Sequence, residues 1–155
     1  MSNFWDSRKS AVLTMVVAWL GLGLGLAGLG GLVPLLKYVY RQAPFLGESF
    51  VARAAGPLYA CLVCGIAAVI ITLLLLGDIR RGEVFTATNV RRLRLISYCG
   101  YAITLACVVG LIVANPWLLF AFIGLVAGFM SLLMRVIKNV IDTARLLKED
   151  ADFTI

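Results

Sequence analysis

The stretch "RRLRLISYCGYAITLACVVGLIVA", residues 91–114, begins with three arginines in four positions and then carries no charge. An α-helix rises about 1.5 Å per residue, so about 20 apolar residues cross a hydrocarbon core of about 30 Å. The uncharged run from Leu95 to Ala114 has this length. It therefore predicts a membrane-spanning helix that starts at a basic boundary.

Three further runs share this character, and the chain of 155 residues is 62% hydrophobic and only 14% charged. The predicted spans are about 10–36, 54–77, 95–114 and 117–134. A lone open sheet would leave backbone groups unpaired in lipid, and the alternating pattern of a membrane barrel is absent. We expect an all-α integral membrane four-helix bundle, with residues 1–155 forming a single transmembrane domain. The first run is about twice the length of a cleavable signal's apolar region, so we expect it to be retained.

The distribution of lysine and arginine predicts the orientation. Four spans place both termini on one side of the membrane. If that side is the cytoplasm, it receives eleven of the 14 basic residues, and Lys37, Arg41 and Arg53 lie outside. Basic residues are enriched in cytoplasmic loops, so we expect both termini to be cytoplasmic.

The loop between the second and third spans concentrates positive charge, and we expect it to contact membrane lipids or a partner. Each basic residue near an anionic membrane surface contributes about 1 kcal/mol of attraction. Thr86 or Thr88 is expected to cap the third helix, with Val90 and Leu93 together on one of its faces. The candidate binding residues of this loop are Arg80, Arg81, Arg91, Arg92 and Arg94.

Residues 135–155 form a predicted cytoplasmic amphipathic tail that continues the fourth helix. Apolar residues such as Val136, Val140 and Leu147 recur there at helical spacing. Lys138 with Asp142, and Arg145 with Glu149, are expected to form i,i+4 ion pairs. The apolar face of this tail needs a covering surface, and the candidates are the membrane, the loop after the second span and another protein.

Glycines at four-residue and three-residue spacing predict close helix packing. Such a face lets another helix backbone approach, either within the bundle or in a homo-oligomer, and the spacing alone leaves both open. The glycines of these two patterns are Gly21, Gly25 and Gly28 in the first span, and Gly124 and Gly128 in the fourth.

Cysteine and hydroxyl residues inside the spans favour packing over chemistry. Cys61 and Cys64 form a CxxC within an apolar run, and antiparallel spans would bring Cys107 to the depth of Cys61. The chain has no histidine, and buried cysteine commonly behaves as a small hydrophobe, so we expect no metal and no cofactor. The mid-span hydroxyls are expected to bond to their own helices; they are Thr14, Thr72, Thr104 and Ser131.

Catalysis and nucleic-acid binding find no support in the sequence. No nucleophile elbow, zinc-protease motif or P-loop occurs, and no span contains a carboxylate, so we expect no enzyme. The net charge of +6 is explained by membrane topology, and aromatic residues interleaved for base stacking are lacking. We therefore expect no direct contact with nucleic acid.

The segment "GEVFTATNVRRLR", residues 82–94, resembles the G-x-x-F-[ST]-x-x-N-x-x-x-L-[RK] stretch of the YoaS-like family, small bacterial four-helix membrane proteins of unknown function. The matching residues are Gly82, Phe85, Thr86, Asn89 and Leu93. The final "LLKEDADFTI" is similar to the family's acidic ending, although Ala151 stands where asparagine is usual. The matching residues there are Glu149, Asp152, Thr154 and Ile155.

The resemblance implies a multi-pass protein of the bacterial inner (plasma) membrane, with a small cytoplasmic DNA-binding regulator as a candidate partner. Together with the charge pattern, it favours a non-enzymatic protein with a regulatory or interaction role. We expect three carboxylates of the tail, Glu149, Asp150 and Asp152, to dock against the arginines of the loop. The alternative is a small transport or permeability element that acts as an oligomer.

Overall fold

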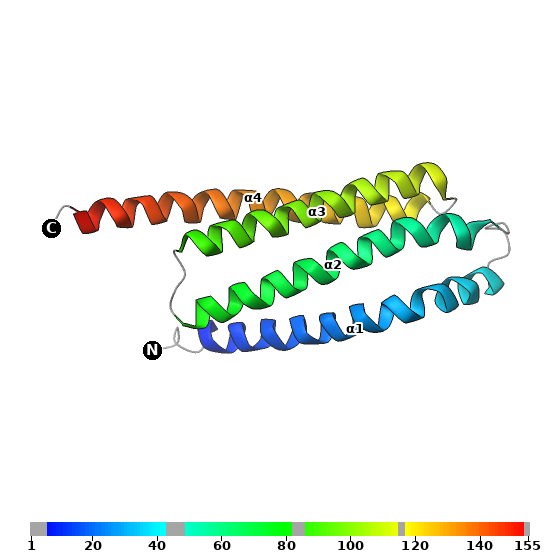
Figure 1. The fold of residues 1–155 in the computed structure, drawn as a ribbon, viewed down its shortest axis with the longest axis horizontal. Helices are drawn as coiled ribbons and strands as arrows, with labels where there is room; N and C mark the ends of the chain where they lie inside the picture. Colours follow the sequence, from blue (N-terminus) through cyan, green and yellow to red (C-terminus); the bar gives the residue numbers. More distant parts are fainter. Residues whose placement is uncertain (1–5, 43–48, 82–85, 115–116, 154–155) are drawn as a thin grey trace.

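The computed structural model describes residues 6–42, 49–81, 86–114 and 117–153, and the regular structure in these ranges is helical throughout. The four helices are α1 (Asp6–Gln42), α2 (Phe50–Arg80), α3 (Ala87–Val113) and α4 (Trp117–Phe153) (Figure 1). Each is long and apolar enough to cross a membrane. The helices contain the predicted spans except for Ala114, which follows α3. The first two extend beyond their spans at both ends, α3 only at its start and α4 only at its end.

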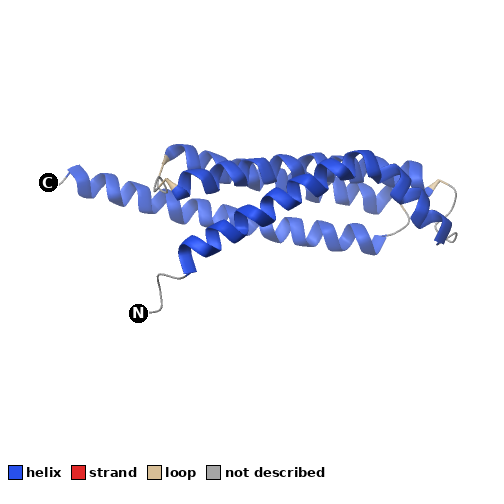
Figure 2. Cartoon of the chain, turned by 90° about the horizontal axis from the view of Figure 1, so that it is seen from below, coloured by secondary structure: helices blue, strands red, loops and turns tan. Residues whose placement is uncertain are grey.

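The helices pack in chain order as an open row. The extensive contacts join α1 to α2, α2 to α3, and α3 to α4. Figure 1 shows this order across the molecule, and Figure 2 shows α1 crossing the others at an angle. A closed bundle would also pack α1 against α4, so the expected bundle is more accurately an open array. Its outer faces are apolar and exposed, as lipid-facing surfaces are.

The α3–α4 hairpin is packed through small residues. A Cβ atom added at Gly110 would lie 2.5 Å from the ring of Phe120, which is fully buried. On α4, an added Cβ at Gly124 would lie 3.0 Å from Cys107. At Gly128 the nearest atom would be the hydroxyl of Thr104, at 3.5 Å. The two backbones therefore approach closely along much of the hairpin.

Glycines also form the contact between α1 and α2. An added Cβ at Gly25 would lie 2.9 Å from Ile66, and one at Gly28 would lie 3.4 Å from Leu62. Gly21, in contrast, would meet no atom within 4 Å. The α1 glycines thus divide between a packed pair and a third position where an added Cβ would meet open space.

The mid-span hydroxyls bond in two ways. Thr72 donates to the carbonyl of Ala68 at 2.8 Å and Thr104 to that of Gly100 at 3.0 Å, as predicted for bonds within one helix. Ser131 differs from the prediction, because its hydroxyl donates across the hairpin to the carbonyl of Ser97 at 2.7 Å. The close approach of α3 and α4 makes this carbonyl accessible.

Candidate functional site

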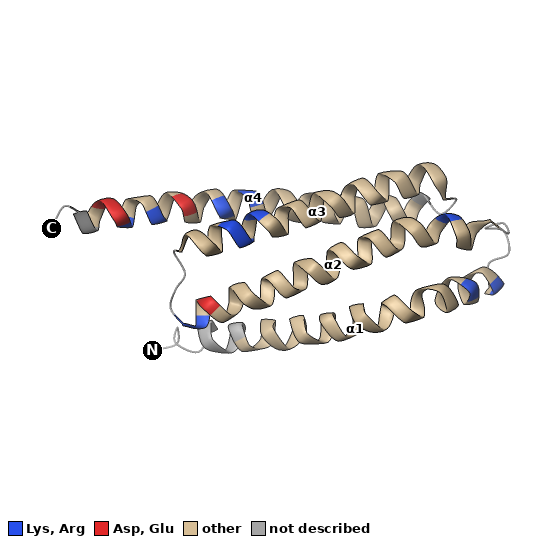
Figure 3. Ribbon diagram, viewed as in Figure 1, with Lys and Arg blue, Asp and Glu red and all other residues tan. Residues whose placement is uncertain are grey.

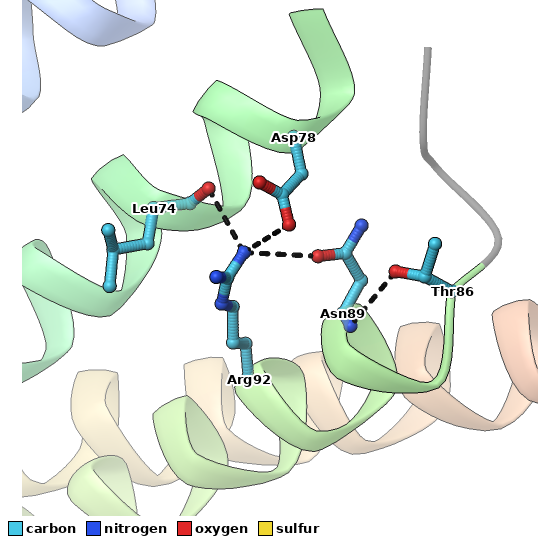
Figure 4. A network of polar contacts seen from close by, with 5 residues as sticks. All are labelled: Leu74, Asp78, Thr86, Asn89 and Arg92. Carbon is cyan, nitrogen blue, oxygen red and sulfur yellow. Dashed lines mark hydrogen bonds and ion pairs between the residues drawn. The ribbon is translucent and has the colours of Figure 1, made fainter. Parts of the chain in front are cut away.

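A polar network joins the end of α2 to the start of α3 (Figure 4). The guanidinium of Arg92 forms an ion pair with Asp78. The same nitrogen donates to the carbonyl of Leu74 at 3.2 Å and to the amide oxygen of Asn89 at 3.4 Å. Asp78 and Arg92 are only 21% and 22% exposed, so packing partly shields the pair from solvent. The network ties two helices whose connection includes residues 82–85, which lie outside the described part.

The first turn of α3 is fixed by its cap and by burial. Thr86 is the N-cap, and its hydroxyl accepts from the backbone N–H of Asn89 at 3.4 Å, which selects it over Thr88. Asn89 is 1% exposed, and Val90 and Leu93 are also buried. Three residues on which the sequence resemblance rests, Thr86, Asn89 and Leu93, therefore have structural roles at this junction. The other matching residues, Gly82 and Phe85, lie outside the described residues.

The remaining arginines of this region have different surroundings. Arg80 contacts the sulfur of Met15 on α1 at 3.5 Å. Arg81 and Arg91 are exposed. Arg94, one turn beyond the network, lines a cavity instead. Of the five predicted arginines, only Arg92 is partly buried, and the other four are exposed.

That cavity has a volume of about 280 Å³ and is lined by α3 and α4. Three of its six lining side chains are cationic, and none is acidic. Sequence reasoning treated Arg135 and Lys138 as charges of the tail and missed that the hairpin brings them to Arg94. The lining residues are Arg94, Ser97, Tyr98, Tyr101, Arg135 and Lys138.

The acidic residues of the tail remain on α4, which continues unbroken to Phe153. Glu149 pairs with Arg145 of its own helix at 2.9 Å, as its spacing predicts. Among the described side chains, Lys138 and Asp142 form no ion pair, contrary to expectation, and Lys138 lines the cavity instead. Asp150 lies on the exposed last turns, and the side chain of Asp152 is outside the described part.

Figure 3 shows that the described basic residues gather at the two ends of the molecule. Those of α1 and the start of α2 lie at one end, and those of the α2–α3 junction lie at the other. The middle portions of α1, α2 and α3 are free of described charges, whereas α4 carries charges from Arg135, at its midpoint, to its last turns. This division matches the charge segregation on which the predicted orientation depends.

Two cysteines approach each other inside the spans. The sulfurs of Cys61 on α2 and Cys107 on α3 are 3.7 Å apart, so these side chains do lie at one depth. All four cysteines are free thiols. Within the described ranges, no three residues among His, Cys, Asp and Glu lie close enough together to hold a metal ion.

Four apolar helices with charges at their ends define a multi-pass membrane protein. The chain belongs to the family described as Protein of unknown function (DUF2975), whose model matches residues 54–155. The match begins within α2 and includes the polar junction, the cavity and the acidic end. No curated protein and no solved structure matches the chain.

Proposed function

We propose that this chain is a non-enzymatic protein of the bacterial inner membrane that presents an interaction surface to the cytoplasm. Within its family we place it with the YoaS-like proteins. The observation that carries the proposal is the length of α4, which extends beyond the first turn of α3 and past the ends of the other helices (Figure 1). Its 37 residues measure about 55 Å, so about 25 Å remain after a hydrocarbon core of about 30 Å.

The extension has an uncovered apolar stripe. Val136, Val140 and Leu147 recur at helical spacing on one side of α4, and each is more than half exposed. The side chains of Lys138 and Arg145, on the opposite side, are only partly exposed. A helix that carries such a stripe outside the bilayer fits an apolar groove on a partner protein.

Charge supports the same surface. The last turns of α4 carry Glu149 and Asp150, while the α2–α3 junction presents exposed Arg81 and Arg91. Acidic and basic groups on one face of the membrane would orient a partner that carries complementary charge. The YoaS-like resemblance favours a small cytoplasmic DNA-binding regulator as this partner, held at the membrane by the extension of α4.

A photo-crosslinking amino acid at Leu147, in the full chain in living cells, tests the proposal. We expect a crosslink to a cytoplasmic protein that is weakened when Glu149 and Asp150 are both changed to lysine. The matched control is the same crosslinker at Leu118, an equally exposed apolar residue near the other end of α4, which should yield no such product. Crosslinks from Leu147 to lipid alone would contradict the proposal and would place the extension on the bilayer surface.

Reconstitution into liposomes distinguishes the transport alternative from the proposed interaction role. Proteoliposomes that contain the purified chain alone should show no solute flux above protein-free liposomes if its function is interaction. Flux that depends on the protein, together with no protein crosslink at Leu147, would favour a permeability element instead.

A further inference from the structure

Three cations surround the cavity between α3 and α4 without a lining carboxylate. Like charges around one cavity repel one another and create a positive potential, which a bound anion relieves. Arg94 and Arg135 come from opposite sides of the hairpin, and Lys138 lies one turn further along α4. The cavity is therefore chemically suited to an anion.

Neighbouring arginines differ from the three cations of the cavity in having acidic partners. Arg92 is paired with Asp78, and Arg145 is paired with Glu149. Among the described side chains, no ion pair is formed by the three cations of the cavity. The hydroxyls of Tyr98 and Tyr101 also form no hydrogen bond to any of the described residues. Donors are thus available on both walls.

The floor of the cavity is rigid. The hydroxyl of Ser97 lies 3.1 Å from the carbonyl of Ser131, and that of Ser131 donates to the carbonyl of Ser97 at 2.7 Å. A Cβ added at Gly100 would lie 2.8 Å from Ser131, so the helices are in close contact directly beside the cavity. Reciprocal bonds from each serine hydroxyl to the carbonyl on the opposite helix hold the basic residues of both walls at a fixed separation, which lowers the ordering cost of binding.

The cavity lies at the depth of lipid headgroups. Arg94 precedes the end of α3 at Val113 by 19 residues, or about 28 Å, and Arg135 follows the start of α4 by 18 residues, or about 27 Å. Both arginines are therefore about one hydrocarbon thickness from the hairpin's other end. The two tyrosines are also typical of the membrane interface.

We propose that this cavity is a binding site for a phosphate group, with Arg94 and Arg135 as its principal ligands. A guanidinium binds two phosphate oxygens at once, while Lys138 adds a point charge and the tyrosines donate hydrogen bonds. The phosphate belongs either to the headgroup of an anionic phospholipid or to a soluble ligand. This site is independent of the proposed interaction role, because it requires no partner protein.

Lipid and soluble phosphate are distinguished with the purified full chain. In one arm, the protein is placed in phosphatidylcholine nanodiscs that contain a minor fraction of phosphatidylglycerol, and the retained phosphatidylglycerol is counted by native mass spectrometry. In the other arm, inorganic phosphate is titrated into the protein in pure phosphatidylcholine nanodiscs. The double variant Arg94→Gln with Arg135→Gln should bind either phosphatidylglycerol or inorganic phosphate about tenfold more weakly or worse, since two charge-assisted contacts are lost.

The matched control is Arg81→Gln with Arg91→Gln, which removes the same charge from the same end of the molecule at exposed positions outside the cavity. The affinity of this control for phosphatidylglycerol or inorganic phosphate should change by less than about threefold, because neither of its two side chains lines the cavity. A selective loss of phosphatidylglycerol identifies a lipid headgroup, and a selective loss of inorganic phosphate identifies a soluble ligand. Equal losses in the two double variants, or a loss in neither, would overturn the site.

Tyr101→Phe keeps the charge and the ring and removes one donor. It provides the decisive measurement if the double arginine variant fails to fold. A loss of about twofold to fivefold would support the site, because one neutral hydrogen bond is removed. If this variant binds both phosphatidylglycerol and inorganic phosphate with unchanged affinity, the proposed site is rejected.

Discussion

Arg92, in the second turn of α3, is ion-paired with Asp78, in the last turn of α2. The pair lies where the second helix ends and the third begins. Because the guanidinium also contacts the carbonyl of Leu74 and the amide of Asn89, it positions both helix ends with one side chain.

Asp78→Asn should lower the free energy of unfolding by about 1 to 2 kcal/mol, because it leaves a partly buried guanidinium without its charge partner. Denaturant unfolding in detergent micelles measures this change. Arg91→Gln, at an exposed neighbouring position, should have an effect within about 0.5 kcal/mol. In a double-mutant cycle with Arg92→Gln, strictly additive effects would show that the pair contributes nothing.

Gly110→Ala should destabilise the α3–α4 hairpin by about 1 to 3 kcal/mol, because the added Cβ would overlap the buried ring of Phe120. The matched control is Gly65→Ala on α2, where an added Cβ meets no atom within 4 Å. That control should be neutral or stabilising by up to about 1 kcal/mol, since alanine favours a helix over glycine. Thermal unfolding measures the melting temperature of each variant. Equal decreases in both variants would contradict the packing of Gly110 against Phe120.

Cys61 and Cys107 should form a disulfide when intact membranes are treated with a membrane-permeant oxidant, because their sulfurs are already 3.7 Å apart. Mass spectrometry of proteolytic fragments detects the bond between α2 and α3. Cys99→Ala should leave the yield unchanged, whereas Cys107→Ala should abolish it. The absence of a Cys61–Cys107 product would refute the register of these two helices.

The proposed orientation predicts that a cysteine placed at Arg81, in a cysteine-free chain, is modified by an impermeant maleimide only after the membrane is opened. Arg53→Cys, at the other end of α2, should react in intact spheroplasts. The physical reason is the excess of basic residues at the Arg81 end, which favours retention in the cytoplasm. Modification of the Arg81 position from outside intact cells would reverse the assignment.

The sequence predicted the helices and limited the cap of α3 to Thr86 or Thr88, because both depend on local patterns. A run without charges requires a helix in lipid, and Thr86 precedes the first helical turn at the position where a hydroxyl can cap it. The pairing of Arg145 with Glu149 also follows from spacing within one helix.

What the sequence did not predict depends on contacts between helices. Asp78 is 14 residues from Arg92 along the chain, and only the approach of two helix ends makes them partners. Ser131 was expected to bond within α4, but the small residues of the hairpin bring the carbonyl of Ser97 within reach. Arg135 was assigned to the tail from its position in the sequence, but the same close approach of α3 and α4 makes it line the cavity.

The row of helices, in which each packs mainly on its neighbours in the chain, determines how the protein can assemble. During synthesis, α1 is already complete when α2 is made, and α3 and α4 likewise follow the helix on which each packs. Each helix therefore meets an earlier neighbour as soon as it leaves the insertion machinery, and none must wait for a distant segment. Such short-range connectivity favours rapid, stepwise maturation in the bilayer.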